Sequence, residues 1–284
     1  MGVIRPLLMT ALQPDPSCQA RATPTPSPSP QGGGACGGAR HRKSLIMEWR
    51  DEALVLGVRR HGESSVIAEL MTRAHGRHAG MVRSGRSRAM QPVLQPGNSV
   101  DAIWRARIEE HLGLYAIEAT RLRTSVLMDS SRALHGVGLV CALLRLLPER
   151  EPHPMLYDMA GVIVDRLHED GIAPALMVRF EMALLVELGF GLDLSCCAST
   201  GGTQELVFVS PKSGRAVSRL AGEAWRDRLL ALPAFLTDNE PESMVTRENV
   251  QAGFRLTGFF LERDVFAARG VPMPDARAGY IACL

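Results

Sequence analysis

Apolar and polar residues alternate with a period of two between Glu52 and about Arg123, in short runs separated by glycine. This pattern is typical of strands with one buried face, and it predicts strands over residues 52–59, 65–72, 77–82, 99–108 and 112–119. The fourth run is the clearest, because Val100, Ala102 and Trp104 share one face. Five short strands favour a small barrel of the OB type, a fold often used to bind single-stranded nucleic acid.

The pattern changes after Thr124, where apolar residues recur at steps of three and four. This helical period predicts amphipathic helices over residues 133–147, 154–169, 174–188, 220–230 and 247–268, with an irregular, turn-rich stretch over 190–218. We therefore predict an α+β multidomain chain, in which an N-terminal OB-fold β-barrel (47–124) is followed by an all-α helical domain (125–284).

The first 46 residues have a different composition, with a Pro/Ser/Thr run over 23–30 and a glycine-rich run that ends at Gly38. Such a segment buries too little apolar area to offset its ordering entropy, so we expect either a disordered leader or a natural start at Met47. The longest uncharged apolar run, 133–144, is too short for the roughly 20 residues that a bilayer requires, so we expect no membrane segment. The cysteines lack a disulfide-framework spacing, which indicates a reducing compartment such as the cytoplasm.

Charge is unevenly distributed: residues 1–46 carry +4, residues 47–126 carry +3 and residues 127–284 carry −5. This asymmetry suggests two surfaces with different partners. The densest cluster is 73–88, which holds five arginines and no acid, so we expect it to be uncompensated and to line one rim of the barrel. Arginine-rich rims bind phosphate backbones without reading sequence. The candidate nucleic-acid contacts are Arg73, Arg77, Arg83, Arg86, Arg88, Arg105 and Arg107.

Two alternatives to this interpretation remain open. The run can be a solvated charged loop, although the missing counter-charges argue against it. Trp104 and Tyr115 can be base-stacking platforms, but Trp104 shares a face with core residues and is expected to be buried.

Catalytic motifs are absent from the sequence: there is no phosphate-binding loop, no His-Glu-x-x-His and no nucleophile elbow. Cys196-Cys197 resembles the start of a zinc knuckle, within an insertion over 190–221. Thr200, Ser218 and Ala221 stand where the other three thiolates would be, so we expect a degenerate site that binds no metal. Cys141 is interpreted as a buried apolar residue.

Several short segments follow one another in a recognisable order. They are Met47–Leu56, Gly62-Glu63, Gly76-Arg77 and Arg83–Arg88 in the first half, and Phe180-Glu181, Leu188–Leu194, Cys197 and Val209–Gly214 in the second. Together they resemble the RecO family of recombination mediators. The resemblance covers about Met47 to Leu284. It implies an OB-fold followed by a helical domain, without a catalytic site or cofactor. The family often carries a four-cysteine zinc site, of which only Cys197 is kept here.

The resemblance also implies a function. Members of this family bind single- and double-stranded DNA, anneal complementary strands, and with RecR help to load RecA onto DNA coated by single-stranded-DNA-binding protein (SSB). We therefore expect a cytoplasmic, nucleoid-associated mediator of RecF-pathway repair whose partners are DNA, RecR, the acidic C-terminal tail of SSB, and also RecF and RecA. Arg132 and Arg145 are the candidates for docking the tail. The alternatives are a scaffold that contacts only proteins, and a redox or zinc enzyme based on Cys196-Cys197.

Overall fold

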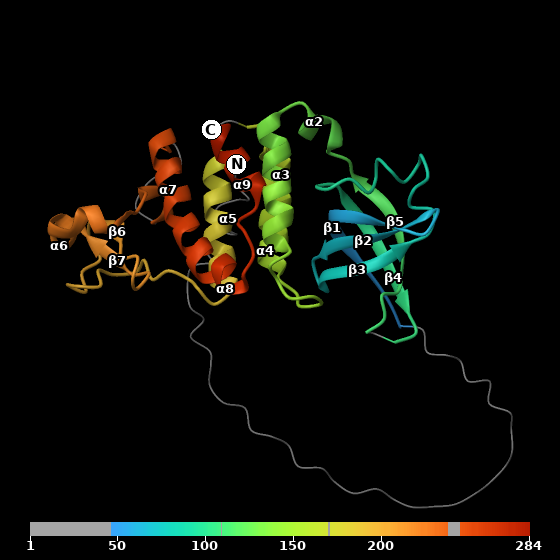
Figure 1. The fold of residues 1–284 in the computed structure, drawn as a ribbon, viewed down its shortest axis with the longest axis horizontal. Coiled ribbons are helices and arrows are strands. Elements are labelled where there is room, and N and C mark those ends of the chain that lie inside the picture. Colours follow the sequence, from blue (N-terminus) through green and yellow to red (C-terminus); the bar gives the residue numbers. More distant parts are fainter. Residues whose placement is uncertain (1–46, 109, 170, 238–244) are drawn as a thin grey trace, which may run out of the picture. The chain divides into compact units, whose positions relative to one another are not determined.

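The computed structural model describes residues 47–108, 110–169, 171–237 and 245–284. Figure 1 shows the elements in chain order. Met47–Leu284 forms one compact unit. The leader for which we expect disorder, residues 1–46, lies outside the described residues.

The first part of this unit is a closed five-stranded barrel with the strand order β1-β2-β3-β5-β4. β1 is long enough to pair with β4 through its first half and with β2 through its second half, and its pairing register with β2 shifts between Val55 and Gly57. β3 and β5 close the barrel in parallel at Met81–Leu114 and Val82–Tyr115. The predicted OB-type barrel is therefore confirmed. The strands are β1 (Met47–His61), β2 (Ser65–Thr72), β3 (Gly76–Val82), β4 (Ser99–Ala106) and β5 (Leu114–Arg121).

Apolar residues of all five strands fill the barrel. β4 alternates between buried and more exposed positions as its sequence predicts. Trp104 is completely buried, and its indole N–H donates to the carbonyl of Leu112 at 3.0 Å. Tyr115 is also buried. The prediction that Trp104 lies in the core is confirmed, and base stacking on either ring is excluded because neither ring face is open.

The second part of the unit is mainly helical. α5 is central and is buried along most of its length, which explains why its sequence is apolar on nearly every side. The predicted helices 133–147, 154–169 and 174–188 are confirmed within a few residues, whereas α2 and α9 were not anticipated. The helices are α2 (Thr124–Met128), α3 (Ser131–Leu144), α4 (Pro154–Arg166), α5 (Ala173–Glu187), α7 (Arg247–Phe260), the π-helical η5 (Leu261–Phe266), α8 (Ala267–Arg269) and α9 (Asp275–Ala282).

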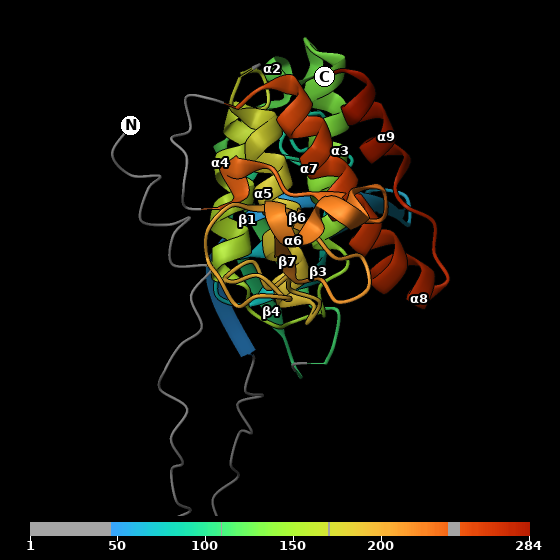
Figure 2. The same cartoon turned by 90° about the vertical axis from the view of Figure 1, so that its left-hand side faces the viewer.

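A small sheet lies where we expected irregular structure. It has the order β7-β6-β8, and Figure 2 looks onto β6, β7 and α6. Strands of two to four residues are too short to produce a readable period, which is why the sequence did not reveal them. The predicted helix over 220–230 is instead α6 (Arg219–Gly222), a 3-10 segment η2 (Glu223–Arg228) and the start of a strand. The strands are β6 (Leu206–Val209), β7 (Ala216–Ser218) and β8 (Leu230–Ala231). No helix in the described ranges is long and apolar enough to span a membrane.

The helical part covers one side of the barrel, and these contacts determine which barrel surface stays open. Arg145 at the end of α3 donates to the Glu69 carboxylate at 2.7 Å and to the Leu56 carbonyl at 2.8 Å. The loop after α3 lies against the start of β3, where Gly76 has a φ of 68° and a methyl group would stand 1.9 Å from the Glu151 carbonyl oxygen. The β2–β3 end of the barrel is thus packed against the helices.

Candidate nucleic-acid interface

The opposite end of the barrel carries the β1–β2 hairpin and the connection 83–98 between β3 and β4. Figure 1 shows the hairpin tip and the outer part of this connection on the side of the barrel away from α3. Arg59 and Arg60 are exposed near the end of β1, where they pair with Ile67 and Val66 of β2. Because successive residues of a strand point to opposite faces, these two guanidinium groups diverge on either side of the hairpin.

Hydrogen bonds hold the connection against the hairpin. The Arg86 backbone N–H donates to the Ser64 carbonyl at 3.1 Å, and its guanidinium donates to the Glu63 carbonyl at 2.5 Å. Gly85 packs so closely on Val66 that a methyl group at this position would lie 2.4 Å from the valine side chain. These contacts hold the arginines after β3 at the same end of the barrel as those at the end of β1.

We call the resulting group the arginine surface, and its members share exposure to solvent and the absence of an ion pair within the described residues. They are Arg59, Arg60, Arg83, Arg86 and Arg88. The only acid in the segments 57–68 and 83–98 that build it is Glu63. Guanidinium groups are planar, permanently charged and able to donate two parallel hydrogen bonds, so they match phosphate geometry. The arrangement can bind a polyanion.

Three of the arginines predicted from sequence have carboxylate partners, so the expectation of an uncompensated array is wrong for them. Arg73 makes a two-fold contact with Asp158 of α4, at 3.0 and 2.9 Å. Arg105 does the same with Glu48 at 2.7 and 3.2 Å.

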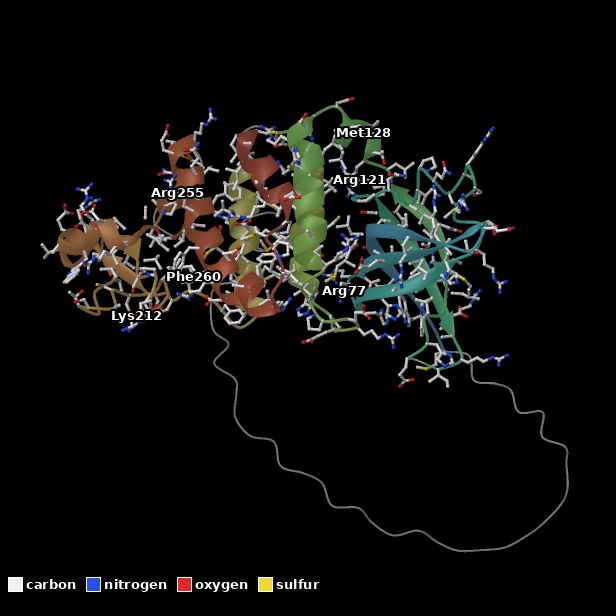
Figure 3. The ribbon with its side chains drawn as sticks, viewed as in Figure 1. Arg77, Arg121, Met128, Lys212, Arg255 and Phe260 are labelled. Atoms are coloured by element: carbon white, nitrogen blue, oxygen red, sulfur yellow. The ribbon has the colours of Figure 1, made fainter. Side chains whose placement is uncertain are left out.

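Arg77, the third, is the most engaged of the candidates. Its guanidinium lies 2.7 Å from Glu69 and 3.3 Å from Glu149, and it also donates to the Leu147 carbonyl at 3.0 Å. Figure 3 shows Arg77 where β3 meets the helices. Arg77 therefore joins the barrel to the helical part rather than facing solvent.

The prediction of a single arginine-rich rim was wrong because β3 separates the two ends of the run 73–88. A strand of seven residues spans roughly 23 Å, so Arg73 and Arg83, at either end of β3, lie at opposite ends of the barrel. Arg107 is exposed in the β4–β5 connection, a third location, and is not part of the arginine surface. Figure 1 shows that connection well apart from the hairpin tip.

Arg59 and Arg60 were missed because they fall at the end of a predicted strand rather than inside the dense run. The signal that identifies them is the pair of arginines immediately before the His61-Gly62 turn. His78, which does belong to the run, contributes no charge. Burial, with the Arg150 charge as a smaller cause, lowers its pKa to about 4, so its ring is neutral at pH 7.

The degenerate knuckle contains a hydrogen-bonded thiol instead of a metal site. Cys197 is buried, and its sulfur accepts from the Ser218 backbone N–H at 3.3 Å. Burial raises the pKa of this thiol, but hydrogen bonds from Ser218 and Thr200 outweigh it and lower the pKa to about 6. One thiolate beside two hydroxyl groups does not supply the donor set of a tetrahedral zinc site. The described residues contain no cluster of three or more metal-ligating side chains.

A second feature is an open depression of about 340 Å³ between α7 and α9. Its lining combines apolar groups with two guanidiniums, those of Arg255 and Arg277. Arg277 is buried and donates to both oxygens of the fully buried Glu181, at 2.8 and 3.0 Å. Arg255 is exposed, and Figure 3 shows it on α7.

Known protein families match nearly all of the described residues. The model of the recombination protein O N-terminal region matches residues 47–124, and that of the recombination protein O C-terminal region matches residues 129–270. Among curated proteins, the DNA repair protein RecO of Methylocella silvestris is 58% identical over 236 residues, which is 83% of this chain and 95% of that protein. RecO of Methylobacterium nodulans is 59% identical over 239 residues, 83% of this chain and 97% of that protein. RecO of Rhizobium etli strain CFN 42 is 57% identical over 235 residues.

Proposed function

The chain belongs to the RecO family of DNA repair proteins, and from this premise we propose that it is a non-catalytic mediator of recombinational repair that grips DNA through the arginine surface. In this role it binds single- and double-stranded DNA, anneals complementary strands, and with RecR helps to load RecA onto SSB-coated DNA. Its site of action is the nucleoid, and RecF is a further partner.

The observation that carries the proposal is the arginine surface itself. Five exposed guanidiniums lie on two adjoining segments that contain a single acid. Solvated charge clusters normally alternate in sign, whereas a surface of one sign that is unpaired within the described residues is the electrostatic footprint of a polyanion partner. Each phosphate bound by a guanidinium releases counterions, so binding of this kind weakens steeply with salt.

Fluorescence anisotropy at two ionic strengths tests this function. The protein is titrated into a labelled single-stranded oligonucleotide at 50 and 200 mM salt, and into the matched duplex. We expect saturable binding to both, weakened at the higher salt to a similar extent for oligonucleotides of unrelated sequence. A scaffold that contacts only proteins predicts no salt-sensitive retention of bare DNA, and that result would reject the proposal.

The acidic tail of SSB requires a different surface, and the two arginines expected from the sequence both have hydrogen-bond partners within the protein. Arg145 is committed to Glu69 and the Leu56 carbonyl, and Arg132 donates to the His168 carbonyl at 3.4 Å. We place the docking site in the depression between α7 and α9, because the exposed guanidinium of Arg255 beside an apolar lining suits an acidic peptide with apolar side chains.

The matched variants for this docking site are Arg255→Glu and Arg219→Glu, two charge reversals on exposed helical residues of which only the first lines the depression. We expect Arg255→Glu to lower the affinity for a synthetic SSB-tail peptide by at least tenfold and Arg219→Glu to leave it within twofold. Equal effects of the two reversals would remove the depression from the docking site.

A further inference from the structure

Apart from the exposed imidazole of His61, the barrel end that carries the arginine surface has no aromatic ring on which a nucleobase can stack. The segments 57–68 and 83–98 contain no phenylalanine, tyrosine or tryptophan. OB-folds that grip single strands through their bases use aromatic side chains as stacking platforms. The groups that this end presents to a nucleic acid are mainly guanidinium groups, hydroxyl groups and backbone, with the single imidazole of His61.

The aromatic residues of the barrel are occupied elsewhere. Trp104 and Tyr115 are buried in the core. Trp49 is only partly exposed, and its ring is stacked between His75, at a centroid distance of 4.1 Å, and Trp104, at 5.6 Å. Both faces of the Trp49 ring are therefore covered by protein.

We propose that the arginine surface holds nucleic acid through its phosphates alone and leaves the bases facing away from the barrel. This inference rests on the proposed function. It adds the orientation of the bound nucleic-acid strand relative to the barrel. The donors of the surface are permanently charged and match phosphate oxygens, while a base that turns inward meets no phenylalanine, tyrosine or tryptophan ring in these segments.

A strand held in this way has its base-pairing edges free. A complementary strand pairs with it without first displacing bases from protein pockets, so binding and annealing occur on the same surface. The duplex that results presents the same phosphates and stays bound by the same groups. The surface therefore does not discriminate between sequences, and it tolerates a change from single to double strand.

The test compares two 30-residue oligonucleotides of equal charge: oligo-dT, and an abasic strand in which every nucleoside is replaced by the tetrahydrofuran analogue. Anisotropy titrations at 50 mM salt give the two dissociation constants. We expect them to agree within twofold. Base stacking is worth roughly 5- to 150-fold in affinity for each base, so a strand that loses even two stacked bases binds more than tenfold more weakly.

A control variant removes the most exposed phenylalanine, tyrosine or tryptophan ring among the described residues of the helical part. Trp225 of η2 is 58% exposed, with Arg228 5.7 Å from its centroid. We expect Trp225→Ala to leave the affinity for both oligonucleotides unchanged. If oligo-dT binds more than tenfold more tightly than the abasic strand, bases are contacted and the inference is overturned, whether or not Trp225→Ala removes the difference. In that case the proposed function stands, whereas a failure of oligo-dT itself to bind in a salt-sensitive manner would reject both.

Discussion

Two double substitutions separate the open arginines from the paired ones. Arg83→Ala with Arg88→Ala removes two guanidiniums of the arginine surface, and Arg73→Ala with Arg105→Ala removes two that face carboxylates. Each double variant lowers the net charge by the same amount, so a general effect of charge is identical in both. Arg86 is left in place because it anchors the connection to the hairpin.

The expected magnitude follows from counterion release. Each phosphate contact on a single strand contributes about 0.7 to the slope of log K against log salt, so losing two contacts flattens the slope by about 1.4. Between 50 and 200 mM salt the affinity of the unmodified protein should then fall about sevenfold more than that of the Arg83/Arg88 variant. Arg73 and Arg105 are already neutralised, and their loss should leave the slope unchanged.

The assay is an anisotropy titration of labelled oligo-dT at four or more salt concentrations, with thermal unfolding of each variant as the control for folding. The reasoning is refuted if both double variants flatten the slope equally, or if the Arg73/Arg105 variant flattens it more. Either result would mean that the sequence run as a whole, and not the open surface, binds the backbone.

Three further predictions concern stability. Gly76→Ala should lower the free energy of unfolding by about 3 kcal/mol or more beyond the effect of Gly62→Ala, as measured in urea titrations. Both glycines have a positive φ, which costs an alanine roughly 1–2 kcal/mol at either position. Only at Gly76 does the added methyl group also clash with the backbone of the neighbouring loop. Arg277→Met should cost about 3–5 kcal/mol by leaving the buried Glu181 carboxylate unpaired, and the double variant with Glu181→Leu should recover part of that loss. Cys197 has a folded-state pKa of about 6, below its ordinary value of 9.0, so its stabilising contribution should be present above pH 9 and be lost as the pH falls to 6. Denaturation of the protein and its Cys197→Ala variant across this range checks the sign, and a difference that grows as the pH falls would contradict it.

The barrel could be predicted from sequence because buried and exposed positions alternate along each strand with a period of two. Val100, Ala102 and Trp104 alternate with Asp101, Ile103 and Arg105, and the first three are completely buried. The longer helices were found because apolar residues recur in them at steps of three and four. α2, with five residues, is too short to show that period, and α9, with eight, buries only Arg277 and Tyr280 and so has no apolar stripe.

The site was predictable only in part, because charge partners depend on tertiary contacts. No residue near Arg73 in the sequence indicates that it pairs with Asp158, which is 85 residues away. Conversely, Arg86 meets Glu63 and Ser64 only because the connection folds back on the hairpin. Local composition predicts a polyanionic partner, but it cannot distinguish guanidiniums that face a carboxylate from those that face water.

The joint between barrel and helices limits how this protein can be rebuilt. Glu69 accepts from Arg77 of its own barrel and from Arg145 of α3, so one carboxylate serves both parts. A chimera that takes its barrel from one relative and its helices from another has to transfer this trio together. Exchanging the barrel alone would leave an acidic or a basic side chain at the junction without its partner. The two parts of the chimera would then pack poorly against each other even where each part folds.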